Sequence, residues 1–262
     1  MDHTFAIPVY RSAPNLGGLI ASLRAQAGSR SEILLASSAP SAGLELLAKS
    51  HGIPLHINPR RIGICEDWNF ALAAVETEFV TLAHQDDSFS PSYAVRLRDA
   101  LARHPDALFA FCDYSEHTPR GPRPINANLQ IKRMLRRLAF GQREYIASRR
   151  SKLRLLSLGN PICCPSVMLN RSAAPDFRFP DGFQSNLDWM AWIELAKRPG
   201  GFIYVRENLV SKGVHGDSET TVAIANRVRE REDREIFDML WPKPVAAALA
   251  VLYRLGYRAN RL

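Results

Sequence analysis

The segment Val80-Thr81-Leu82-Ala83-His84-Gln85-Asp86-Asp87 carries the strongest signal in this chain. Its apolar first half has the composition of a short buried strand, and that strand ends in two adjacent carboxylates. Unpaired carboxylates are costly to bury, so Asp86 and Asp87 need a partner. A divalent cation is suitable, because Mg²⁺ and Mn²⁺ take oxygen ligands and often bridge protein carboxylates to a substrate diphosphate. A helix cap is the alternative, since Ser88 and Ser90 lead into a helical segment.

Apolar runs alternate with segments of helical periodicity through the first half of the chain. We expect strands at residues 4–9, 32–36, 54–57, 79–83 and 107–112, and helices at 16–27, 42–50, 65–75 and 93–103. This alternation predicts an α/β fold with a mainly parallel sheet and helices on both faces. Ligands of such sheets bind beyond the carboxyl ends of the strands, where Asp86 and Asp87 fall.

The second half of the chain is less regular. A loop at residues 118–124 precedes a basic helix from Lys132 to Arg154. Further strands are predicted at 165–169, 202–205 and 209–215, and further helices at 186–197, 220–240 and 245–257.

Composition places the chain among ordinary globular proteins. Its 262 residues suit one domain with an appendage, and no run of 18 apolar residues suggests a spanning helix. The N-terminus does not resemble a signal peptide. The four cysteines lack metal-cage spacing, which favours reduced thiols and a cytoplasmic location.

The net charge of +8 is concentrated in one segment. Residues 130–154 contain nine Lys and Arg against one Glu. Such a segment could meet nucleic acid, anionic lipid or an anionic substrate, or form a solvated helical face. Because no basic-aromatic recognition motif accompanies it, we expect no nucleic-acid partner.

Several short motifs occur in a characteristic order along the chain. They are Ile7-Pro8-Val9-Tyr10-Arg11, the set Asn58, Gly63 and Asn69, then Gln85-Asp86-Asp87, Pro165-Ser166-Val167-Met168, Asn186-Leu187-Asp188-Trp189 and Val214-His215-Gly216-Asp217-Ser218. This ordered set resembles glycosyltransferase family 2, the inverting nucleotide-sugar transferases of the GT-A (Rossmann-like) fold. The resemblance covers roughly residues 5–231. It implies a GT-A domain over residues 1–240, with an acceptor-side insertion at about 114–160, and a C-terminal amphipathic helix or tail over 241–262.

The resemblance also implies roles for the acidic residues. Asp86 would face the donor ribose, and Asp87, together with His215, would hold Mg²⁺ or Mn²⁺ against the diphosphate. Asp188 would be the base that takes the proton of the acceptor hydroxyl. A helix cap is the alternative for Asp188, and a structural role is the alternative for His215.

The donor site implied by the family includes Pro8, Tyr10, Ser37 and Asn69. Relatives place a base-reading aspartate after the second strand, whereas this chain has Ser37 and Ser38 there. This departure bears on which base is bound; a UDP-sugar is still the expected donor, with a dTDP-sugar or another nucleotide as the alternative. Tyr10 could instead be half-buried core, and Asn69 could merely satisfy nearby backbone groups.

The implied activity is transfer of a sugar from a nucleotide-diphosphate donor to a hydroxyl, with inversion. The implied setting is bacterial surface polysaccharide or lipid-linked glycan synthesis, and a silent carbohydrate-binding or scaffold protein is the alternative. Peripheral contact with the inner face of the membrane would run through the segment from Lys132 to Arg154 or through the C-terminal tail. For Trp189 and Trp192 the alternatives are an acceptor-sugar platform and the core.

Overall fold

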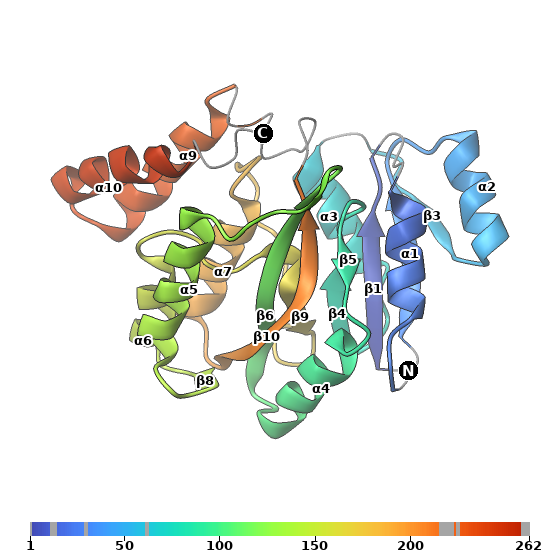
Figure 1. Ribbon diagram of the computed structural model, residues 1–262, viewed down its shortest axis with the longest axis horizontal. Helices are drawn as coiled ribbons and strands as arrows, with labels where there is room; N and C mark the ends of the chain where they lie inside the picture. The colour runs from blue at the N-terminus through green and yellow to red at the C-terminus, as the bar shows by residue number, and fades with distance from the viewer. Residues whose placement is uncertain are drawn as a thin grey trace.

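The protein is built around one mixed sheet, whose strands β6, β9, β4 and β1 lie side by side across Figure 1. The computed structural model describes residues 2–10, 15–28, 31–60, 63–214, 223 and 226–257. The sheet order is β3-β2-β1-β4-β9-β6-β10-β5. The first four strands of that order pair in parallel: β3 (Leu55–Ile57), β2 (Glu32–Ser37), β1 (His3–Pro8) and β4 (Phe79–Leu82). Their carboxyl ends therefore meet at one edge.

The second half of the sheet combines parallel and antiparallel pairs. β9 (Val167–Asn170) runs antiparallel between β4 and β6 (Ala107–Thr118). β10 (Gly201–Gly213) then pairs in parallel with β6, while β5 (Ser88–Phe89) pairs antiparallel with β10. The short β7 (Gly121–Pro122) and β8 (Tyr145–Ile146) pair with β6 and β10. The predicted fold class, a mixed and mostly parallel sheet flanked by helices, is confirmed.

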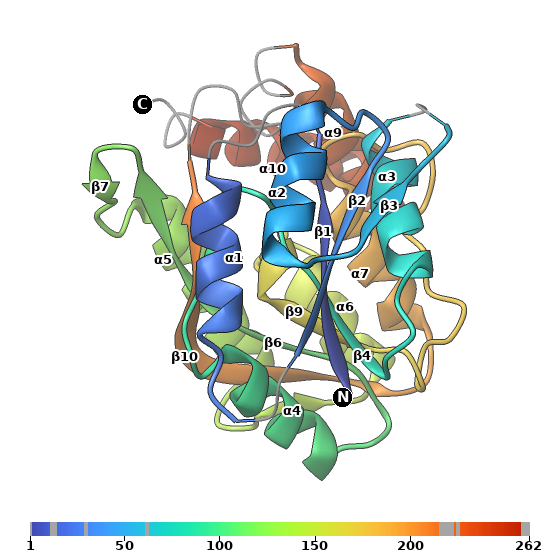
Figure 2. The same ribbon diagram turned by 90° about the vertical axis from the view of Figure 1, so that its right-hand side faces the viewer.

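Helices cover both faces of the sheet (Figures 1 and 2). One core lies under α1 (Leu16–Arg24), α2 (Ala42–His51) and α4 (Tyr93–Arg103). The other lies under α3 (Ile64–Ala73), α6 (Arg149–Leu156), α7 (Leu187–Lys197) and α9 (Val228–Leu240), and α5 (Ala127–Phe140) and α10 (Lys243–Leu255) contribute to its border. Successive side chains of β1 point to opposite faces of the sheet, so Phe5 and Ile7 belong to the first core and Ala6 to the second.

Three expected elements differ from the structure. The predicted helix from Lys132 to Arg154 is wrong: Gly141, at φ +57°, ends α5, and β8 separates it from α6. The strands expected at 202–205 and 209–215 are one strand, β10, which continues through a bulge after Val205 because β6 pairs along its whole length. The loop expected at 118–124 contains β7, which folds back on β6.

The C-terminal helix α10 packs on the body. Ala246 is fully buried, and the ring of Tyr253 lies 5.6 Å from both Trp189 and Phe237. Among the described residues, no helix is long and apolar enough to span a bilayer.

Candidate active site

The carboxylate pair lies in a tight turn after β4, against the end of β10. The Asp87 N–H donates to the His84 carbonyl at 3.1 Å, which closes the turn. The Gly213 N–H donates to Asp87 Oδ1 at 3.0 Å. A Cβ at position 213 would lie 2.5 Å from the Asp86 carbonyl oxygen, so only glycine permits this approach. Two segments 126 residues apart are thereby joined at one point.

Asp87 is 4% exposed, and half of its carboxylate lacks a partner. Oδ2 is buried and accepts no hydrogen bond from any residue within the described ranges. Burial and the neighbouring Asp86 raise the pKa of Asp87 well above its usual value, against the opposing effects of the Gly213 N–H and Lys212. A buried, unpartnered carboxylate oxygen beside a second carboxylate fits a bound cation. Asp86 is half-buried and therefore the more accessible ligand of the two.

The predicted metal site is only partly visible. His215 lies outside the described residues, so its part in metal binding stays a prediction. No group of three or more potential ligands occurs within the described part of the chain. A cation at this site would therefore need further oxygen ligands, such as a substrate diphosphate.

Asp188 lies in the first turn of α7. Its Oδ1 accepts the Trp189 N–H at 2.8 Å, while Asn186 occupies the N-cap position. Asp188 is therefore not the N-cap residue itself, although its side chain satisfies one N–H of the first turn. Burial raises the pKa of Asp188 above its usual value, and three cations oppose that rise: Arg229, Lys212 and Lys132.

Those cations come from three different elements; the sequence pointed to Lys132 as the start of the basic segment, but not to Lys212 or Arg229. Lys132 of α5 donates to the Tyr114 hydroxyl at 2.9 Å, and burial lowers its pKa. Burial acts to lower the pKa of Lys212, but Cys163, Tyr114 and Asp87 around it raise the value overall. A lysine two residues after the apolar pair Leu209-Val210 of a predicted strand was the available sequence signal for Lys212.

The buried thiol of Cys163 is influenced by both Asp87 and Asp188. Burial, with smaller contributions from Asp87 and Asp188, raises the pKa of its thiol to about 12, while Lys212 and Lys132 oppose the rise. Asp87, Asp188 and Lys212 therefore share one partly buried region at the carboxyl edge of the sheet. Such a region can hold a diphosphate at its cationic side and accept a proton at its acidic side.

The end of the Pro8-Tyr10 strand adjoins the same turn. Tyr10 is 46% exposed, so part of its ring is accessible at the surface, and its N–H donates to Gln85 Oε1 at 3.3 Å. Ser37 is buried, and its hydroxyl accepts the Ala39 N–H at 3.2 Å.

A carboxylate does reach the end of β2, but it comes from α3. The Ser38 hydroxyl donates to Asp67 Oδ2 at 3.0 Å, and the Asn58 amide donates to Oδ1 at 3.4 Å. Burial raises the pKa of Asp67, against both hydrogen bonds. Asp67 thus stands beside the serines that replace the expected aspartate. The sequence analysis missed Asp67 because α2 and β3 separate α3 from β2 along the chain.

Three further candidates are engaged in structural contacts. Asn69 is buried and uses its amide on the backbone of Phe179, at 2.8 and 3.0 Å, which is the backbone-satisfying alternative. Trp189 and Trp192 are almost fully buried, so the acceptor-platform alternative is wrong and both belong to the core. The Trp189 indole N–H donates to the Leu156 carbonyl at 3.0 Å.

Helix α9 holds the turn that precedes α7. The carboxylate of Glu232 is 1% exposed and accepts three backbone N–H groups, from Gln184, Ser185 and Asn186. Asp233 accepts the Asn186 side-chain amide at 2.8 Å. These contacts fix the start of the helix that carries Asp188.

Comparison with known proteins bears on the family and on the fold. The model of the family described as Glycosyl transferase family 2 matches residues 4–176. No sequence among the curated proteins matches the chain. Residues 1–349 of TarS from S. aureus superpose with a TM-score of 0.65 at 14% identity, over 98% of this chain and 72% of that one. A Pyrobaculum calidifontis mannosyltransferase, solved with GDP-Man and Mn²⁺, gives 0.66 at 16% identity, over 98% and 70%. At 14% and 16% identity these solved structures show that the fold is shared, and nothing finer.

Proposed function

The chain belongs to glycosyl transferase family 2, and on that premise we propose that it transfers a sugar from a nucleotide-diphosphate donor to a hydroxyl acceptor, with inversion. The observation that carries the proposal is the buried carboxylate of Asp87, whose Oδ1 is held by the Gly213 N–H at 3.0 Å and whose Oδ2 has no partner among the described residues. We assign residues 1–240 to the transferase domain, with an acceptor-side insertion at about 114–160, and residues 241–262 to a C-terminal tail.

The donor would lie across the ends of β1, β2 and β4. Tyr10 offers an exposed ring to the base, and Asp67 offers a carboxylate beside Ser38. A carboxylate accepts hydrogen bonds only, so it selects a base with an N–H at the contacted edge. Uracil and thymine both meet that condition through N3–H, so Asp67 is compatible with the expected UDP-sugar and with a dTDP-sugar as the alternative. A TarS structure contains UDP-GlcNAc and the mannosyltransferase contains GDP-Man, so guanine is a third option for the test.

Asp87 would hold Mg²⁺ or Mn²⁺, with His215 as a further ligand. The unpartnered, buried Oδ2 of Asp87 supports this assignment. When bound, such a cation neutralises charge on the diphosphate leaving group. Lys212 adds a positive charge from β10 at the same place. Asp86, as the more exposed of the pair, could contact the donor ribose or share the cation.

Asp188 would act as the base. The acceptor oxygen forms a bond to the anomeric carbon, the bond from that carbon to the diphosphate oxygen breaks, and the hydroxyl proton passes to Asp188. One displacement from the opposite face inverts the anomeric centre. A pKa raised by burial brings the carboxylate closer to neutral pH, where general bases work best.

The acceptor side is cationic. Lys132 and Arg229 both act on Asp188 from elements that border the site, α5 and α9. This supports an acceptor that carries negative charge, such as a lipid-linked glycan diphosphate in bacterial surface polysaccharide synthesis. Such a reaction would take place at the inner, cytoplasmic face of the membrane.

A nucleotide-sugar panel tests the proposal directly. Thermal unfolding would be measured with UDP-, dTDP- and GDP-sugars, with and without Mn²⁺. We expect a rise in Tm with one base that requires the cation and disappears in Asp87→Asn. NMR of the product from an α-linked donor should show a β linkage. A retained configuration would overturn the inversion, and absence of any donor-dependent shift would favour the silent scaffold.

A further inference from the structure

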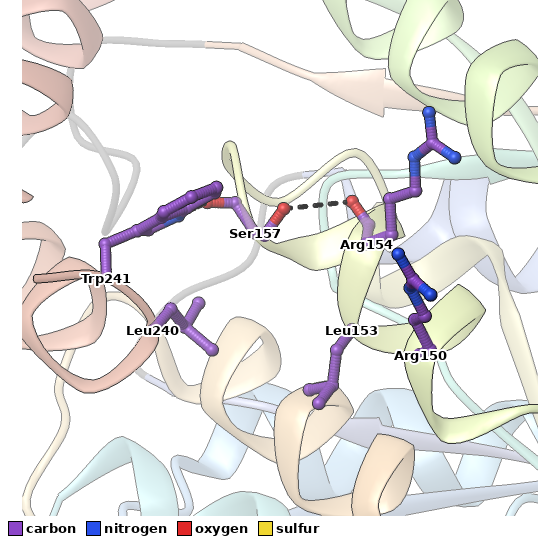
Figure 3. Close-up of a pocket in the computed structure, with 6 residues that line it drawn as sticks. All are labelled: Arg150, Leu153, Arg154, Ser157, Leu240 and Trp241. Carbon is purple, nitrogen blue, oxygen red and sulfur yellow. Dashed lines mark hydrogen bonds between the residues drawn. The ribbon is translucent and has the colours of Figure 1, made fainter. Parts of the chain in front are cut away.

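A groove separate from the carboxylate site lies between α6 and the junction of α9 with α10 (Figure 3). It has a volume of about 510 Å³ and is lined by Arg150, Leu153, Arg154, Ser157, Leu240 and Trp241. Figure 3 shows the two arginines on one side and the indole ring on the other. The Trp241 N–H donates to the Ser157 carbonyl at 2.7 Å, which holds the ring in place.

The cationic side of the groove is not neutralised by any acid in the described part of the chain. Arg150 and Arg154 are four residues apart on α6, so both project from one face. Within the described residues, neither guanidinium pairs with a carboxylate. The only acid between residues 127 and 157 is Glu144, which pairs with Arg103 at 3.0 Å. The groove therefore favours an anionic occupant.

Exposed apolar side chains occur on the helices to either side. On α5 they are Ile131, Met134 and Leu138, which are spaced by three and four residues and are each more than half exposed. On α10 they are Val251 and Leu252, also more than half exposed. Helices α5, α6 and α10 lie together at the end of the molecule remote from α2 (Figure 1).

We propose that this end of the molecule docks on an anionic bilayer, with Arg150 and Arg154 on lipid phosphates and Trp241 at the headgroup level. Exposed apolar side chains enter the headgroup boundary while arginines bind its anionic groups, as on interfacial helices. An indole ring, apolar with one polar edge, suits the same depth. A water-soluble anion would account for the arginines but not for the exposed apolar side chains on α5 and α10.

The groove adjoins α7, the helix that carries the proposed catalytic base Asp188. Ser157 receives the Trp241 N–H, and the preceding residue, Leu156, receives the Trp189 N–H. Docking here would keep Asp188 near the membrane, where a lipid-linked acceptor resides. That consequence depends on the proposed function, whereas bilayer binding itself does not.

Vesicle co-sedimentation without donor or acceptor tests the docking alone. We expect the full chain to bind phosphatidylglycerol-containing vesicles and not pure phosphatidylcholine. Arg150→Gln/Arg154→Gln should weaken binding about 25-fold, since each cation near an anionic surface contributes about fivefold, or about 1 kcal/mol. The matched control is Arg24→Gln/Lys49→Gln, which removes the same charge from α1 and α2 and should stay within about twofold of wild type.

Fluorescence provides a second readout. Brominated phosphatidylglycerol should quench Trp241, and the quenching should fall in Trp241→Phe. Equal loss of binding in the test and control variants would overturn the proposal, because net charge alone would then explain the attraction. A failure to bind anionic vesicles would also overturn it, as would a dimer in sedimentation that dissociates in Arg150→Gln/Arg154→Gln. The donor-induced Tm shift should be unchanged in that variant, so the two proposals fail separately.

Discussion

Glu232 Oε2 accepts the backbone N–H of Asn186 at 2.9 Å, and it does so in a fully enclosed position on α9. The same carboxylate also binds the N–H groups of Gln184 and Ser185, at 2.7 and 3.0 Å. Three charge-assisted hydrogen bonds to one turn are strong and geometrically restrictive. The start of α7, and with it Asp188, therefore depends on a helix more than forty residues further along the chain.

We expect Glu232→Gln to lower the free energy of unfolding by about 2–4 kcal/mol, because the amide carries no charge and turns an N–H donor toward backbone donors. Urea unfolding measures this. Glu235→Gln, an exposed change on the same helix, is the control and should stay within about 0.5 kcal/mol of wild type. Equal stability of the two variants would show that the contacts with the turn contribute little.

Asp188→Asn should keep the donor-dependent rise in Tm but lower kcat by about 10²–10⁴-fold, because the proton acceptor is removed while the donor site is intact. Steady-state kinetics and the thermal-shift assay together separate the two effects. In the wild type, activity should fall as the pH drops through the raised pKa of Asp188. Glu194→Gln on the same helix is the control. Loss of donor binding in Asp188→Asn would instead indicate a structural residue.

Gly213→Ala should disturb the carboxylate pair, because the added methyl group would lie 2.5 Å from the Asp86 carbonyl oxygen. We expect donor affinity in the presence of Mn²⁺ to fall by about tenfold or more, equivalent to about 1.4 kcal/mol. Calorimetric titration measures this. Gly43→Ala is the control, since its new methyl group would meet nothing closer than 3.9 Å. Unchanged affinity would mean that the turn can shift without cost.

His3 should make stability depend on pH. It is fully buried between Ser31 and Thr81, at 2.9 and 3.0 Å, and burial lowers its pKa from 6.5 to about 3. Below pH 6.5, His3 therefore binds a proton in the unfolded chain, whereas in the folded chain it stays neutral until the pH approaches 3. Stability contributed by neutral His3 is full above pH 6.5 and falls as the pH drops toward 3.

Between pH 7 and pH 5 this residue alone should reduce the free energy of unfolding by about 2 kcal/mol. Urea unfolding of wild type and His3→Gln at both values isolates the effect, because the variant cannot titrate there. A difference between the two proteins that stays constant with pH would contradict the expectation.

Most of the elements could be predicted locally. Alternating apolar residues and helical periodicity encode each strand and helix through neighbours a few positions away, as at residues 79–83 and 93–103. The break at Gly141 was missed because the basic, amphipathic pattern continues on both sides, while β8 forms only by pairing with the distant β10.

The sequence by itself determined the α/β alternation, the family and the placement of Asp86, Asp87 and Asp188 near element ends, because each depends on local pattern or ordered motifs. Only the tertiary structure decided what surrounds them. Gly213 reaches Asp87, Asp67 reaches Ser38, and Glu232 reaches Asn186 through contacts that span 29 to 126 residues. Such contacts depend on how the crossovers stack the elements, and no short-range periodicity encodes that arrangement.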